Sequence, residues 1–144
     1  MTNIVALVRA WLVSDFVVSD LVDDRVSSIL DPEDGFPAIG IGSVTGGPRS
    51  TTTAGVDTVE DWSVALYCYG GRLNGNDSDL PDNQAAWEVV TAISYAAQNI
   101  ATEHFIDDGA AIVAAQVVTS SATAVDPDTG SSRATVTLSL QVWR

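Results

Sequence analysis

The sequence predicts an α+β domain in which a mostly antiparallel sheet of four or five strands carries two helices on one face. Apolar residues recur at helical spacing near the start and in the middle of the chain, which indicates the two helices. Three other stretches alternate apolar and polar residues between turns rich in Gly, Pro and Asp, which indicates strands. The 144 residues fit one domain spanning 1–144, and 46% of them are apolar, so a core can be buried.

The first predicted helix covers residues 3–14, with Thr2 or Asn3 as its N-cap. Its apolar stripe consists of Ile4, Leu7, Val8, Trp11 and Leu12. A second apolar patch follows at residues 16–22. It either continues the helix after a kink or forms a turn packed beneath it.

Two strands are expected next, at residues 25–30 and 38–44. The turn between them, residues 31–35, contains a Pro that fixes φ and a Gly that tolerates positive φ. Residues 45–58 are rich in Thr, Gly and Ser and predict a long loop.

The clearest strand is predicted at residues 59–69, because its two faces differ. The inward face carries Trp62, Val64, Leu66 and Cys68. The outward face carries Asp61, Ser63, Ala65, Tyr67 and Tyr69. Since two tyrosines lie on the outward face, it is expected to meet either a partner or the second helix.

The second helix is predicted at residues 82–104 and is followed by strands at 111–121 and 133–143. Its apolar stripe consists of Trp87, Val90, Ile93, Ala97, Ile100 and His104. The strand at 111–121 is almost continuously apolar, which predicts that both of its faces are covered. The turn at 126–130 suggests that the last two strands form an antiparallel hairpin.

The charge is strongly unbalanced, with 19 acidic residues, six Arg and no Lys, giving a formal net charge of -13. Binding to nucleic-acid phosphates by counterion release requires clustered Arg and Lys, so this function is disfavoured. An anionic membrane surface would repel the chain for the same reason. No apolar run reaches the length of a membrane span.

The sequence contains no motif typical of an active site. The single histidine, His104, is placed at a helix end, and the single cysteine, Cys68, lies on an apolar strand face, where it acts as a small hydrophobe. The acidic segments 77–79 and 126–130 do not match a calcium-binding loop, and residues 46–51 lack the lysine of a phosphate loop. We therefore expect no catalytic residues, no cofactor and no metal. A small soluble α+β enzyme or ligand-binding domain remains an alternative.

Several segments occur in a characteristic order over about residues 3–143. The N-terminal helix is followed by the acidic segment 20–26, then by Phe36-Pro37-Ala38-Ile39, and an aromatic strand ending at Gly70 precedes an Ala-rich helix. This order resembles the tail terminator and tail-completion (minor tail) proteins of long-tailed phages.

The resemblance implies a structural virion protein of the tail or neck, assembled in the host cytoplasm. It implies a hexameric ring that caps the head-proximal end of the tail tube, stops tube polymerisation and joins the neck. The implied partners are further copies of the chain, the major tail tube protein and the head–tail connector. DNA would pass through the lumen without specific binding, and no membrane would be involved. A head-closure or adaptor protein of the neck is the alternative within this class.

A ring needs two different contact patches on each subunit. The candidate interface residues are Arg49, Tyr67, Tyr69, Arg72, Trp143 and Arg144, because aromatic residues and Arg are enriched in interface cores. The alternative for the three aromatic residues is that the second helix covers them. The acidic composition further suggests a channel wall that repels DNA.

Overall fold

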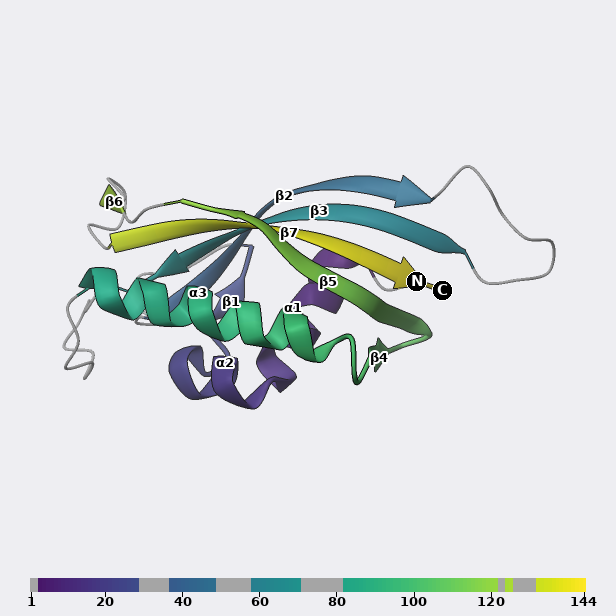
Figure 1. Cartoon of the computed structure of the whole chain (residues 1–144), viewed down its shortest axis with the longest axis horizontal. Helices are drawn as coiled ribbons and strands as arrows, with labels where there is room; N and C mark the ends of the chain where they lie inside the picture. Colours follow the sequence, from purple (N-terminus) through teal and green to yellow (C-terminus); the bar gives the residue numbers. More distant parts are fainter. Residues whose placement is uncertain (1–2, 29–36, 49–57, 71–81, 122–123, 126–131) are drawn as a thin grey trace.

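The computed structural model describes residues 3–28, 37–48, 58–70, 82–121, 124–125 and 132–144 (Figure 1). Within these residues a twisted sheet has three helices on one side. The helices are α1 (Ile4–Ser14), α2 (Phe16–Val22) and α3 (Asp82–Asn99). The strands are β1 (Val26–Ser27), β2 (Ala38–Pro48), β3 (Val59–Tyr69), β4 (Phe105–Asp107), β5 (Ala110–Ser120), β6 (Ala124–Val125) and β7 (Ser132–Trp143).

The sheet has seven strands in the order β1-β2-β3-β7-β5-β4, with β6 paired to β7. It is mixed, because β1 runs parallel to β2 while the other pairings are antiparallel. The expected fold class, four or five mostly antiparallel strands with two helices, is therefore wrong. Strand β1 lies within the strand predicted at residues 25–30, but β4 and β6 were missed, because they contain only three and two residues, too few to produce a detectable alternation.

The third helix arises because Asp15 interrupts the N-terminal apolar segment. Its backbone is extended (φ -74, ψ 128), and its carboxylate accepts hydrogen bonds from the Val17 and Val18 amides, each at 3.0 Å. This is an N-cap, so residues 16–22 begin a new helix after a sharp break. The stripe predicted for the first helix is confirmed, since all five of its residues are buried.

The core lies between the helices and the sheet. Val64, Leu66 and Cys68 are buried on the inward face of β3, as predicted, and Trp62 is half-buried there. On β7 the inward residues are Ala134, Val136, Leu138, Leu140 and Val142. Tyr69, placed by the sequence on the outward face, is only 8% exposed and packs with Ala38.

Helix α3 packs against β3, β5 and β7 through its small residues, and it ends at Asn99 rather than at 104. Trp87 was expected to face the core but is 40% exposed, whereas its neighbour Ala86 is buried. Successive helical residues are separated by roughly 100° around the helix axis. Because Ala86 faces the core, the indole of Trp87 points outward. His104 lies beyond the helix and is exposed.

Two strand predictions also need correction. Strand β2 extends to Pro48, so residues 45–48 are strand rather than loop, and residues 49–57 lie outside the described part. The strand β5 was expected to be covered on both faces, but only Ala110 and Ile112 are buried in it. The helices cover a single side of the sheet, so the other face of β5 meets solvent. The predicted turns at 31–35, 77–79 and 126–130 lie outside the described residues.

Candidate assembly surfaces

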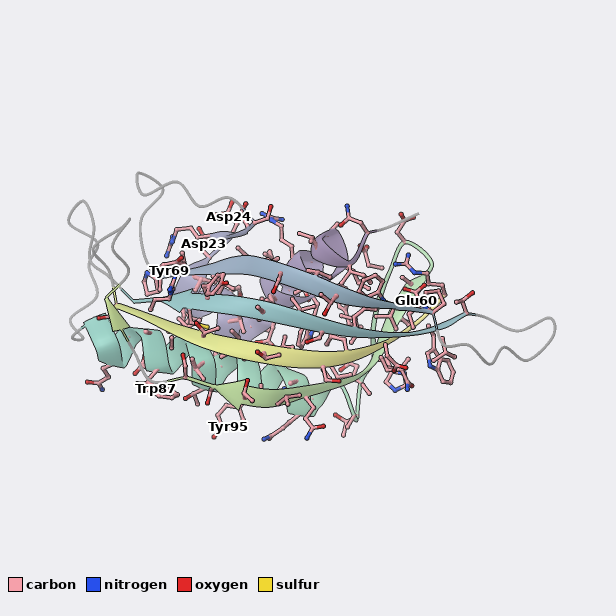
Figure 2. All side chains as sticks on the ribbon, turned by 90° about the horizontal axis from the view of Figure 1, so that it is seen from above. Asp23, Asp24, Glu60, Tyr69, Trp87 and Tyr95 are labelled. Carbon is pink, nitrogen blue, oxygen red and sulfur yellow. The ribbon has the colours of Figure 1, made fainter. Side chains whose placement is uncertain are left out.

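The structure does not gather the predicted interface residues into one patch. Arg49 and Arg72 lie outside the described residues. Tyr67 and Trp143 are on the free face of the sheet but near opposite ends, because Tyr67 pairs with Thr135 and Trp143 with Val59. Tyr69 and Glu60 likewise mark opposite ends of the sheet in Figure 2.

Tyr67 and Trp143 have different surroundings. Tyr67 is half-buried, and the Arg133 guanidinium carbon lies 4.9 Å from its ring centroid, a cation–π contact. Trp143 is 46% exposed, and its Nε1 donates to Oε1 of Gln141 at 3.1 Å. Of the two, Trp143 offers more apolar area to a partner.

Arg144 forms an ion pair with a residue that the sequence analysis overlooked. Its Nε lies 2.8 Å from Oε2 of Glu60, and the indole of Trp62 donates to Oε1 at 2.8 Å. The backbones of Thr58 and Arg144 exchange two hydrogen bonds of 2.9 Å. Glu60 is 6% exposed, and its position two residues before Trp62 was the signal that it points inward.

This ion pair lies beside an apolar groove of about 800 Å³ at the end of the sheet. Its walls come from the start of α1, the end of β2 and the start of β3, and include Ile4, Val5, Val44, Pro48 and Trp62. The groove therefore adjoins one edge of the sheet.

Both edges of the sheet are open over long stretches of the described chain. Strand β1 pairs only with residues 39–40 of β2, and β4 pairs only with residues 110–112 of β5. The remaining residues of these strands, 41–48 and 113–120, have no described strand on their outer side. We call them the β2 window and the β5 window.

The two windows have the same length and lie level across the sheet. At one end the cross-strand neighbours are Ile41, Leu66, Val136 and Ser120, and at the other they are Pro48, Glu60, Val142 and Ile112, the residue just before the β5 window. Neither window contains a charged residue, although the chain carries a net charge of -13. Exposed edges are usually protected by charges, so uncharged edges are typical of strands that pair with another chain. Bulges in both strands and Pro48 are the protective features present.

Burial raises the pKa of the Cys68 thiol to about 12, which keeps it protonated and unreactive. No group of three or more His, Cys, Asp or Glu side chains in the described part is arranged to hold a metal ion. Among the helices described, none has the length and apolarity to cross a membrane.

By its fold, the described part of the chain is an α+β domain. Its helices lie on one side of a twisted mixed sheet, and both edges of that sheet have long uncharged stretches without a described neighbouring strand. The same fold occurs in a chain of a solved structure described as the virion of a native gene transfer agent particle. The match has a TM-score of 0.63 at 17% sequence identity, and it covers 98% of this chain and 95% of the other. No family model matches the sequence. No curated protein matches it either.

Proposed function

We propose that this chain is a structural protein of a phage-like virion, a tail terminator that forms a ring at the head-proximal end of the tail tube. The observation that carries the proposal is the fold shared over nearly the full length of both chains with a component of a gene transfer agent virion. The resemblance to tail terminators in the order of sequence segments supports the finer assignment. In this role the protein stops tube growth and joins the neck without a chemical step.

The two windows provide the contact patches that a head-to-tail ring requires. The pairings β2·β3, β3·β7 and β7·β5 are all antiparallel, so β2 and β5 run in opposite directions within one subunit. A rotation axis parallel to the strands preserves these directions. The β2 window of one subunit would therefore meet the β5 window of the next in antiparallel pairing, which continues the sheet around the ring.

In such a ring, we infer that the free face of the sheet lines the channel. Its outward residues on β7 are Thr135, Thr137, Ser139 and Gln141, with Asp61 and Arg133 as nearby charges on the same face. The exposed acids of the described chain lie elsewhere, namely Asp20, Asp23, Asp24, Glu103, Asp107 and Asp108. As far as the chain is described, this wall is thus polar and nearly uncharged rather than acidic, and its Arg133 is stacked on Tyr67. Without an array of cations the wall cannot hold DNA phosphates.

Edge variants test the head-to-tail arrangement. Val118→Lys blocks the β5 window and Ser43→Lys blocks the β2 window, because an edge lysine opposes strand addition. Both side chains are exposed, so both monomers should fold. By native mass spectrometry each variant alone should be monomeric, and a mixture of the two should form dimers but no rings. Dimers of either variant alone would contradict head-to-tail pairing.

The assignment as a terminator is tested on tube growth. Added to polymerising subunits of the cognate tail tube, the wild-type chain should cap tubes and shorten them in negative-stain images. The matched control is the Tyr95→Ser variant, which changes an exposed residue outside both windows. Rings that bind the neck connector but leave tube length unchanged would instead identify a head-closure or adaptor protein.

A further inference from the structure

A second groove, of about 630 Å³, opens on the helical side of the molecule, and no residue of either window lines it. One wall is the break between α1 and α2, residues 14–17. The other is the end of α3 with the segment 102–105 that leads into β4. Aromatic rings from three elements line it, namely Trp11, Phe16 and Phe105.

Phe16 at the rim is 91% exposed, the highest value among the large hydrophobic residues described, and Val17 beside it is 53% exposed. The Asp15 cap fixes the backbone at this point, since its carboxylate holds the Val17 and Val18 amides at 3.0 Å. The ring is thus held in solvent by a rigid break rather than by a flexible end. Exposed aromatic rings beside a groove are typical of binding sites.

The charge of the groove is negative. Glu103 is exposed in its lining, Asp15 stands at its rim, and no arginine lies among the lining residues. His104 is the one basic side chain there. A groove lined by both aromatic rings and carboxylates suits a guanidinium, which can stack on a ring and pair with an acid.

The described arginines of the chain itself already have partners. Arg9 donates to the Val26 and Asp24 carbonyls, and Arg25 donates to the Pro37 and Leu21 carbonyls. Arg133 lies over Tyr67, and Arg144 is paired with Glu60. A second copy also carries a net charge of -13, so a negative groove would repel it, and the occupant favoured here is a different, basic protein.

We propose that this groove docks an arginine-bearing segment of another protein, with the guanidinium on Phe16 and Glu103 and an adjacent apolar side chain against Val17. The proposal does not depend on ring formation, because the groove lies within one chain. In this proposal a basic partner binds the helical side of the molecule, and copies of the chain bind at the sheet edges.

The test uses the full chain and a fluorescein-labelled peptide in which Arg and Leu alternate between glycines, followed by fluorescence polarisation. Phe16→Ser and Glu103→Gln should each weaken binding by about tenfold, as expected for a partly desolvated cation–π contact and its acid. The matched controls are Tyr95→Ser, an exposed aromatic residue outside the groove, and Asp20→Asn, an exposed acid outside it. Both controls should bind like the wild type.

Three outcomes would overturn the proposal. The first is no saturable binding of the peptide to the wild type, and the second is equal binding of a peptide with Glu in place of Arg. Alternatively, Asp20→Asn could weaken binding as much as Glu103→Gln, which would reveal attraction to net charge alone. A circular dichroism spectrum like that of the wild type for Phe16→Ser ensures that a loss of binding reflects the groove.

Discussion

At the scale of single residues, Glu60 is the least expected side chain, a carboxylate at the edge of an apolar core. Its two oxygens face Arg144 and the Trp62 indole, each at 2.8 Å. Burying a charge is tolerated when it is paired and hydrogen-bonded, and breaking such a pair leaves the other charge uncompensated. Glu60 therefore joins the start of β3 to the chain beyond β7.

We expect Glu60→Gln to lower the free energy of unfolding by about 2 kcal/mol. The amide can still accept from Trp62, but the Arg144 guanidinium, with 16% of its side chain exposed, loses its counter-charge. Urea denaturation at neutral pH measures the change. The exposed acid Asp20 provides the control, since Asp20→Asn should shift stability by no more than about 0.5 kcal/mol. Equal effects of the two substitutions would show that the pair does not contribute.

The buried thiol of Cys68 gives stability a dependence on alkaline pH. Its pKa rises from 9.0 to about 12 because burial disfavours the thiolate. The folded state thus holds a proton that the unfolded state loses, so this contribution is intact below pH 9.0 and declines as pH rises toward 12. We expect a loss of up to ~1.4 kcal/mol per pH unit in that window. Urea denaturation series of the wild type and of Cys68→Ala should differ in this slope, and identical slopes would refute it.

At the scale of elements, β2 depends on a glycine that no other residue can replace. Gly46 has φ +142, and a Cβ added there would collide with the backbone carbonyl oxygen of Asp61 on β3. Its neighbour Gly47 has no heavy atom within 4 Å of such a Cβ. Substituting each glycine in turn therefore distinguishes the effect of close packing at Gly46 from the effect of simply losing a glycine.

Gly46→Ala should destabilise the fold by about 2 kcal/mol or more, since it adds backbone strain and a clash in the β2·β3 pairing. Gly47→Ala should change stability by no more than about 1 kcal/mol. Thermal unfolding of both variants, followed by circular dichroism, makes the comparison. A Gly46→Ala variant as stable as Gly47→Ala would indicate that β2 adjusts its path.

The long elements could be predicted from the sequence because each buries enough residues to show its period. The α1 stripe and the inward face of β3 are examples. Strand β1 lies within the strand predicted at residues 25–30, whereas the short strands β4 and β6 could not be found, since they exist only through tertiary pairing. Trp87 was misplaced because α3 buries alanine, valine and isoleucine side chains instead of its largest residue. In the sequence, the two windows are only uncharged stretches, because their position at the sheet edges depends on the strand order.

At the scale of the whole molecule, charge opposes self-association. Each chain carries a net charge of -13, and the described arginines are used within the chain. Subunits that meet through uncharged windows must approach against mutual repulsion, which salt screens. Ring assembly should accordingly be favoured by salt rather than opposed by it.

We expect the oligomer fraction to rise between about 10 mM and 150 mM NaCl, as the Debye length falls from about 30 to 8 Å. Sedimentation velocity at a fixed protein concentration measures this fraction. The Val118→Lys variant serves as the control and should stay monomeric at both concentrations. An oligomer that dissociates as salt is added would point to ion pairs between subunits and against the windows.

In the proposed ring, the short strands β1 and β4 would also limit how far neighbouring subunits can slide past one another. β1 occupies the outer side of β2 just before the β2 window, and β4 occupies the outer side of β5 just before the β5 window. Since β2 and β5 are antiparallel, these blocks stand at opposite ends of the sheet. A neighbour that slides toward β1 would drive the end of its β5 window into β1. The same slide would not move its own β4 into an unoccupied position. Glycine-rich strands such as β2 are prone to slip in register. In this arrangement, steric contact with β1 and β4, rather than recognition between side chains, would set the register between neighbouring subunits.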